Sequence, residues 1–271
     1  MARYTTDDLE ILIATIARED LSFLEAIFSQ PLESIVHNIL IVNQSKTSQL
    51  KSDFHNIRVI NDVNPGLSRS RNIAIENSIG KILWIMDDDC LIADDAVNKI
   101  VDAHSSYKHE VIVFQTTTFD NELIRTYSRS AQSLSHSEIK KILSPEITLK
   151  KASIIASGLS FDVKFGLGAQ FQDSENYVFF LDLIRKGIPM FFVPEIIVSH
   201  TALTSSNEVE SNRLIYARGA LAAKIHPSTA RFYQWKYVFF LWRKGYVTSF
   251  TKLVDKFRIF GQGIEDYNSG R

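Results

Sequence analysis

The chain has 271 residues, a formal net charge of −1, 45% hydrophobic and 23% charged residues, which are ordinary values for a globular protein of one large or two small domains. This balance gives no indication of a nucleic-acid partner, the single cysteine excludes an intrachain disulfide, and no apolar run approaches the ~20 residues that span a bilayer. The N-terminal residues also lack an apolar segment followed by a cleavage site. We therefore expect a cytoplasmic protein, free or peripheral on the inner face of the cell membrane.

Apolar runs alternate with a helical pattern in the first part of the chain. Leu9–Ile16, Ile35–Val42 and Ile57–Ile60 are short and apolar, which predicts buried strands. A helix is expected from about Leu21 to Phe28, because its apolar residues recur on one face. Strands that alternate with helices favour a mostly parallel sheet covered on both faces.

The most distinctive stretch runs from Asn64 to Cys90. A Pro65–Gly66 turn leads into a basic helix start, and this helix is expected to end near Gly80. The apolar run Lys81–Met86 then predicts a buried strand that delivers three consecutive carboxylates, Asp87, Asp88 and Asp89. Carboxylates at the end of such a strand lie where open α/β sheets bind ligands. Their mutual repulsion favours a cation bound among them.

The chain continues with a helix expected at Asp94–Ala103, which has acidic residues in its first turn, and a strand at Val111–Thr116. Residues 119–150 are polar and weakly patterned. They predict an irregular excursion over the active face.

A glycine loop near Gly166 then precedes an apolar helix that closes at Arg185–Gly187, a typical helix end. Ile188–Val198 predicts a strand that ends beside His200. From Asn207 onward the pattern is helical and increasingly basic and aromatic.

The aspartates carry the clearest chemical signal. Asp87 and Asp89 lie on one side of an extended segment, because side chains alternate with period two, and Asp88 points away. Mg²⁺-type cations bind one or two carboxylates together with substrate phosphates, so this pair predicts a metal that bridges a diphosphate. Two interpretations stay open for the basic helix start that precedes this strand. Arg69 and Arg71 either contact phosphate or are solvated helix charges, and Asn72 either orients the loop or contacts a sugar, or only caps the helix.

These motifs resemble the family 2 glycosyltransferases, which have the nucleotide-sugar-binding GT-A fold. The family's G-x-x-x-x-R-N segment and D-x-D metal motif look like GLSRSRNIAI and LWIMDDDC, its acceptor-side segment looks like FDVKFGLGAQFQDSENYVFFLDLIRKG, and its histidine-bearing strand looks like VPEIIVSHT. The resemblance spans roughly residues 9–201. It implies an α/β fold with a mostly parallel central sheet flanked by helices. The pattern along the chain favours one catalytic domain over residues 1–204, with a helical, basic and aromatic appendix over residues 205–271.

The resemblance also implies roles for single residues. The nucleotide pocket after the first strand would be lined by Thr15, Ala17 and Arg18. Asn43 and Gln44 stand where the family usually has an aspartate that contacts the base, which leaves the nucleotide open among UDP, GDP and dTDP, with a UDP-sugar expected first. Donor and metal contacts (Mn²⁺ or Mg²⁺) would come from Asp87, Asp88, Asp89 and His200.

The general base has two candidates. Inverting transfer requires a carboxylate that takes the proton of the acceptor hydroxyl. The family's G-E-D aligns with Ser174, Glu175 and Asn176, and an amide such as Asn176 cannot act as a base. We therefore expect Glu175, or failing it Asp173, to be the base. Otherwise the enzyme has lost activity.

The C-terminal appendix is basic and aromatic. Residues 231–260 hold 11 of the 30 aromatic residues and seven Lys/Arg against one Asp. On a helix, Phe232, Trp235, Phe239 and Trp242 form one stripe. An interfacial helix on an anionic membrane is the first interpretation, while nucleic-acid binding and packing on the domain are the alternatives.

Together these features predict an inverting, metal-dependent glycosyltransferase. Its acceptor would be a hydroxyl of a glycan or of a lipid-linked acceptor. A catalytically impaired sugar-nucleotide-binding subunit is one alternative, motivated by Asn43 and Asn176. A nucleotidyltransferase is another, but that class requires a glycine-rich loop with a lysine after the first strand, and Ala14–Asp20 has neither. The sequence does not indicate the sugar, the linkage or the oligomeric state.

Overall fold

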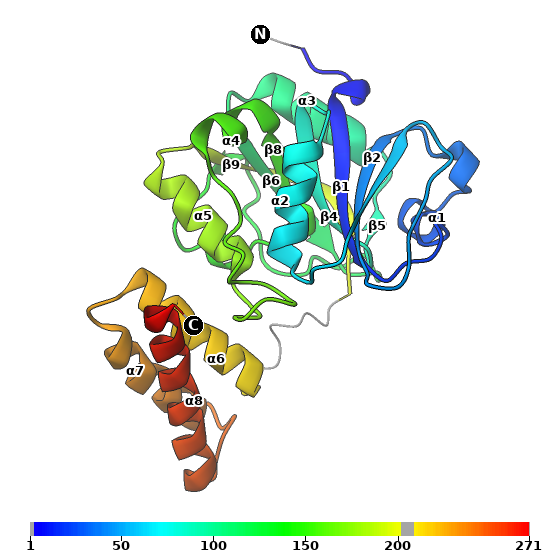
Figure 1. Cartoon of the computed structure of the whole chain (residues 1–271). Helices are drawn as coiled ribbons and strands as arrows, with labels where there is room; N and C mark the ends of the chain where they lie inside the picture. The colour runs from blue at the N-terminus through cyan, green and yellow to red at the C-terminus, as the bar shows by residue number, and fades with distance from the viewer. Residues whose placement is uncertain (1–2, 202–208, 271) are drawn as a thin grey trace.

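The computed structural model describes residues 3–201 and 209–270, and its centre is one mixed, nine-stranded sheet (Figure 1). The strands along the chain are β1 (Leu9–Ile16), β2 (Asn38–Gln44), β3 (Ile57–Asp62), β4 (Ile82–Asp87), β5 (Leu91–Ile92), β6 (Val111–Thr117), β7 (Gln132–Ser133), β8 (Ile147–Lys150) and β9 (Met190–Ser199). Their order across the sheet is β3-β2-β1-β4-β8-β6-β9-β5, and β7 also pairs with β9.

Strand direction decides where the strand ends lie. The strands β3, β2, β1 and β4 are mutually parallel, as the alternation of strands and helices predicts. The short β8 is antiparallel to both β4 and β6, and β9 is parallel to β6. The carboxyl ends of β1, β2, β4, β6 and β9 therefore meet at one edge of the sheet.

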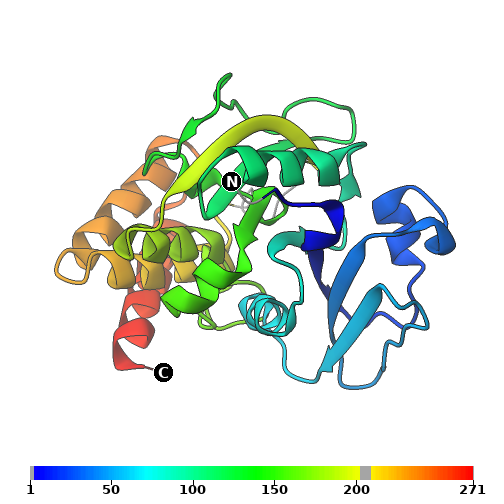
Figure 2. The same ribbon diagram turned by 90° about the horizontal axis from the view of Figure 1, so that it is seen from above.

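Helices cover both faces, and Figure 2 shows cyan α2 and teal α3 on opposite sides of the sheet. One face packs against α1 (Phe23–Phe28) and α3 (Ala96–Ser106) around the buried Trp84. The other packs against α2 (Leu67–Asn77), α4 (Lys151–Ser157) and α5 (Glu175–Arg185). Short 3₁₀ helices are η1 (Thr6–Asp8), η2 (Leu32–Ser34), η3 (Ile139–Lys141) and η4 (Ser144–Glu146).

The excursion over residues 119–150 is held by a buried ion pair. Glu146, which is fully buried, accepts hydrogen bonds from both terminal nitrogens of Arg125 at 2.5 Å and from the Tyr127 hydroxyl at 2.6 Å. The indole of Trp84 donates to the carbonyl of Pro145 at 2.8 Å. These contacts fix η4 beneath the carboxyl edge of the sheet. They also fix the start of β8, a strand in a segment for which the sequence pattern predicts no regular structure.

The C-terminal helices α6 (Asn212–Ile225), α7 (Ala230–Arg243) and α8 (Phe250–Ser269) form a unit below the sheet in Figure 1. The helices α6 and α8 touch backbone to backbone, because a Cβ on Gly219 would lie 2.1 Å from the carbonyl oxygen of Phe260 and one on Gly263 would lie 2.1 Å from that of Tyr216. The predicted boundary at residues 204/205 lies outside the described residues. Within the part of the chain that is described, no helix combines the length and apolar character needed to cross a bilayer.

Candidate active site

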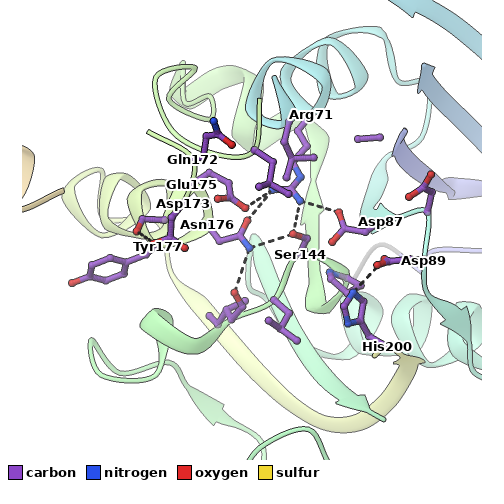
Figure 3. A pocket seen from close by; sticks show the side chains of 18 of the residues that line it. Arg71, Asp87, Asp89, Ser144, Gln172, Asp173, Glu175, Asn176, Tyr177 and His200 are labelled. Atoms are coloured by element: carbon purple, nitrogen blue, oxygen red, sulfur yellow. Dashed lines mark hydrogen bonds and ion pairs between the residues drawn. The ribbon is translucent and has the colours of Figure 1, made fainter. Parts of the chain in front are cut away.

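A pocket of about 470 Å³ opens at the carboxyl edge of the sheet. Its walls come from the ends of β1 and β4, the residue after β9, the loop from Lys140 to Pro145, the start of α5 and one residue of α6. Figure 3 shows Asp89 and His200 at one end, Tyr177 at the other, and Arg71 and Ser144 between them. Of the residues proposed from the sequence, the lining includes Thr15, Gln44, Arg71, Asp87, Asp88, Asp89, Asp173, Glu175 and His200.

Arg71 joins the two halves of this pocket. Its side chain is only 2% exposed, and its Nη2 donates to Oδ1 of Asp87 at 2.9 Å and to the Ser144 hydroxyl. Its Nη1 donates to Glu175 Oε1 at 3.2 Å and to Asn176 Oδ1 at 3.1 Å. We call these five residues the Arg71 network. A guanidinium with this many partners within the protein is a fixed cross-link between β4 and α5 rather than a solvated helix charge.

The loop after β1 is tied to the second aspartate. Asp88 accepts hydrogen bonds from the Thr15 hydroxyl and from Arg18 Nε at 3.1 Å and Nη2 at 2.8 Å. The fully buried Asn43 accepts from the Arg18 backbone N–H and donates to the Arg18 carbonyl, both at 3.1 Å. Asp88 therefore holds the loop that contains Ala17, whose φ of 54° is left-handed. Ala17, Arg18 and Asn43 are not among the residues that line the pocket.

Three other predicted residues stabilise the chain around α2. Gln44 accepts from the Gly66 backbone N–H at 2.8 Å and donates to the Ser70 hydroxyl, so it fixes the start of the helix. Arg69 pairs with Asp62 at 2.6 Å. Asn72 makes two hydrogen bonds of 2.8 Å with the backbone of Phe161. Arg69 and Asn72 therefore lie outside the pocket lining.

The third aspartate pairs with the predicted histidine across the sheet edge. Asp89 Oδ1 lies 3.2 Å from His200 Nε2. The hydrogen bond to His200, followed by its charge, lowers the pKa of Asp89 although burial opposes this. Burial lowers the pKa of His200, but the hydrogen bonds to Asp89 and to the Thr201 carbonyl outweigh it, so the net shift of the pKa is upward. The two groups thus stabilise each other's charged forms.

The same pair can hold a divalent cation. Potential ligand atoms of Asp89, Cys90 and His200 lie within 4.8 Å of one another. Because His200 Nδ1 lies 2.8 Å from the Thr201 carbonyl, which can only accept, Nδ1 carries the proton and a neutral ring keeps Nε2 free to bind a metal. Burial and then the charges of Asp87 and Asp89 raise the pKa of the Cys90 thiol. Because a metal binds the thiolate and not the thiol, the available ligand atoms are the Asp89 oxygen and the His200 nitrogen. Asp87, which was predicted to bind the metal as well, is not part of this group, and its Oδ1 accepts a hydrogen bond from Arg71.

The candidate bases lie on the acceptor-side segment. Glu175 is the first residue of α5 and is oriented by Arg71. Asp173 pairs instead with Arg218 of α6 at 3.2 Å and accepts from the Ser174 hydroxyl at 2.5 Å. The amide of Asn176 donates to the Ser144 hydroxyl at 3.3 Å. Glu175 and Asp173 therefore line one pocket but are held by different arginines.

Several lining residues were missed in the sequence. Lys140, Lys141 and Ser144 belong to the weakly patterned excursion, where no local motif marks them. Tyr177 follows the acidic turn, and only its position next to Glu175 and Asn176 could have indicated that it lines the pocket. Arg218 occupies an unremarkable position in a basic helix.

The family model described as "Glycosyl transferase family 2" matches residues 21–158, which are 138 of the 271 residues. The chain belongs to this family. It is a glycosyltransferase of α/β class with the GT-A fold, as the sequence motifs predict. No curated protein sequence matches it.

Solved structures agree with the fold. The crystal structure of S. aureus TarS residues 1–349 is similar with a TM-score of 0.53 and 13% identity, over 97% of this chain and 92% of that one. The same TarS fragment has also been solved with UDP, with a TM-score of 0.52, and with UDP-GlcNAc, with a TM-score of 0.53, both at 13% identity and the same coverage. At this identity the likeness concerns the fold alone.

Proposed function

We propose that this glycosyltransferase is inverting and metal-dependent and takes its sugar from a nucleotide diphosphate donor, first of all a UDP-sugar. The observation that carries the proposal is the arrangement of one pocket. Asp89 and His200, which can hold a cation, lie at one end, and the carboxylate Glu175 lies on the other side of Arg71 from them (Figure 3). The UDP and UDP-GlcNAc complexes of the similarly folded TarS support the choice of donor.

The donor end is assigned as follows. Asp89 and His200 would hold a divalent cation, Mn²⁺ or Mg²⁺, and Asp87, whose Oδ1 accepts from Arg71, would contact the ribose. When bound, such a cation neutralises the diphosphate as it departs. Asp88 keeps Thr15 and Arg18 in place, so the loop after β1 is preorganised beside the nucleotide.

The acceptor end supplies the base. Glu175 takes the proton of the acceptor hydroxyl while that oxygen forms a bond to the anomeric carbon. The bond from this carbon to the diphosphate oxygen breaks, and the diphosphate leaves with the electron pair. Asn176 cannot take a proton, and it instead bonds Arg71 and Ser144, which orients Arg71 against Glu175. The acceptor is a hydroxyl of a glycan or of a lipid-linked acceptor.

Donor binding tests the assignment. Nucleotide sugars are screened by thermal shift with Mn²⁺, and the best is titrated by calorimetry with and without EDTA. We expect affinity to require the metal and to be lost in Asp89→Ala, while Asp94→Ala, an exposed aspartate outside the pocket, retains it. Donor affinity that is insensitive to EDTA would refute the metal site. Tight donor binding without transfer or hydrolysis would support the alternative of a catalytically impaired binding subunit.

An anionic membrane surface is the partner proposed for the C-terminal unit. The stripe on α7 faces outward, with Phe232 and Trp235 each 67% exposed, Phe239 55% and Trp242 54%. The opposite side of α7 carries Leu241, which is buried in the core of the unit. A surface of this kind favours a binding role. It argues against burial of the stripe on the domain.

Exposed basic side chains accompany the stripe on α7, just after it and on α8. Lys236, Arg243, Lys244 and Lys252 are exposed, and within residues 3–201 and 209–270 none of them forms an ion pair with a carboxylate. Exposed rings with lysines and arginines beside them suit an interface with anionic headgroups. This is the basis for proposing a peripheral position on the inner face of the cell membrane.

Cosedimentation with vesicles tests this surface. We expect salt-sensitive binding to phosphatidylglycerol vesicles and little binding to phosphatidylcholine. Phe232→Ser/Trp242→Ser should weaken it, whereas Phe119→Ser, which changes an exposed ring elsewhere, should not. Failure of the intact protein to bind anionic vesicles at low salt would refute the membrane partner and leave another protein or a second copy as the occupant.

A further inference from the structure

The far end of the pocket has a chemistry of its own, which rests on the proposed function but goes beyond it. Lys140, Lys141, Tyr177 and Arg218 line this end. It lies across the Arg71 network from Asp89 and His200, as the position of Tyr177 in Figure 3 shows. A donor diphosphate held at Asp89 would leave this end for the acceptor.

The charge of this end is positive. Lys140 and Lys141 are exposed at the pocket wall, and among the described residues neither pairs with a carboxylate. Lys140 Nζ lies 5.7 Å from the centroid of the Tyr177 ring. Arg218 shares its charge with Asp173 at 3.2 Å. Three cations against one carboxylate leave a net charge of +2, in a pocket whose other end is acidic.

The basic and aromatic character continues from the pocket to α7. Tyr177 packs against the cluster that contains Ala217 and Leu221 of α6, and burial and then the charge of Tyr233 of α7 raise the pKa of Tyr177. Lys236 Nζ in turn lies 5.7 Å from the centroid of the Tyr233 ring. A strip of rings and ammonium groups therefore leads from the reaction end of the pocket to the exposed face of the C-terminal unit.

We propose that this strip binds an acceptor that carries phosphate next to the sugar that is glycosylated. A phosphate monoester has a charge of about −1.5 to −2 at pH 7, which balances the net +2, whereas a carboxylate supplies only one charge. Ring faces such as Tyr177 pack against the apolar faces of sugars, while lysines contact the phosphate oxygens. The phosphate can belong to a lipid phosphate or to a phosphorylated glycan, since both offer the same oxygens.

Binding of matched acceptor probes tests the proposal, with and without UDP. The probes are alkyl glycosides, the corresponding alkyl phosphoglycosides, alkyl uronosides and soluble phosphorylated oligosaccharides, titrated by calorimetry. We expect phosphoglycosides to bind about tenfold or more tightly than their neutral partners. Added salt should reduce this preference. Equal affinity for soluble and alkyl phosphorylated probes indicates a phosphorylated glycan, and tighter binding of the alkyl form indicates a lipid phosphate.

The variant Lys140→Glu/Lys141→Glu should abolish the preference for phosphorylated probes. Lys140→Ala/Lys141→Ala should reduce this preference, and it replaces the first variant if the charge reversal perturbs folding. Lys51→Glu/Lys108→Glu changes two exposed lysines outside the pocket and should keep it. Equal affinity for neutral and phosphorylated probes, uronosides that bind as tightly as phosphoglycosides, or a preference that survives both Lys140/Lys141 variants would overturn the proposal. If the unchanged protein binds no nucleotide sugar, the donor assignment is refuted. The acceptor proposal is still tested in that case, because the probe preference is also measured without UDP.

Discussion

Arg71 gives the sharpest test of how this site is built. Its buried guanidinium carries the only positive charge in the Arg71 network, between Asp87 and Glu175. Arg71→Met keeps the stem but removes the charge and four hydrogen bonds, those to Asp87, Ser144, Glu175 and Asn176. Two carboxylates then remain without their shared cation.

The magnitude follows from burial. Breaking one partner of a buried ion pair costs about 3–5 kcal/mol. The side chains of Asp87 and Glu175 are 27% and 15% exposed, so water relieves part of this cost. We therefore expect the free energy of unfolding to fall by about 3 kcal/mol, or the midpoint temperature to fall by about 6–12 °C.

Urea unfolding of matched variants measures this effect. Arg69→Met, two residues earlier on α2, removes an exposed arginine that pairs with Asp62 and should change stability little. Adding Glu175→Gln to Arg71→Met should restore about 1 kcal/mol or more, because the two residues interact directly. If Arg71→Met and Arg69→Met lower the free energy of unfolding by the same small amount, Arg71 is not a stabilising cross-link between β4 and α5.

Three other changes test separate features. Glu175→Gln should lower the transfer rate by about 10²–10⁴-fold at unchanged donor affinity, while Asp173→Asn should do less; the reverse order in steady-state kinetics would identify Asp173 as the base. His104 is buried, and because the Thr148 hydroxyl donates to the Ile112 carbonyl, His104 Nε2 donates to Thr148 and Nδ1 is unpartnered; burial and then Lys150 lower the pKa of His104 to about 3. Since the unfolded chain takes up this proton near pH 6.5 and the folded chain does not, the stability that His104 contributes is complete above pH 6.5 and falls by about 2 kcal/mol at pH 5; urea unfolding should show a weaker dependence in His104→Gln. Gly263→Ala should cost about 1–3 kcal/mol by forcing α8 away from the Tyr216 carbonyl, and an unchanged thermal midpoint would contradict the close crossing of α6 and α8.

Local signals were sufficient for the strands that end at the acidic edge of the sheet. The run Leu9–Ile16 is a strand with the bounds that its apolar residues predict, and Lys81–Met86 is a strand shifted by one residue. The resemblance to the family implied that His200 returns toward Asp89, and parallel strands, which place their carboxyl ends at one edge, bring the two together although 111 positions separate them. Asp89 and His200 each follow an apolar run, and such runs are predicted to form buried strands.

The strand β8 was not predicted, because local sequence patterns do not identify it. It has four residues, Ile147–Lys150. So short a run has no periodicity that separates a strand from a loop. Its place between β4 and β6 depends on hydrogen bonds that those two strands provide.

By itself the sequence determined the family, through its ordered motifs, and the α/β order of the elements and the acidic edge of the sheet, because strands, helices and the three aspartates depend on neighbours within a few residues. Only the tertiary structure decided the rest of the site. The sequence left Arg71 open between a phosphate contact and a solvated helix charge, and the structure excludes the solvated charge because Ser144 and Glu175, 73 and 104 residues away, bind it. The helix α7 has rings on both sides, so its composition could not say which face is buried. Packing against α6 and α8 covers one face and leaves Phe232, Trp235, Phe239 and Trp242 exposed.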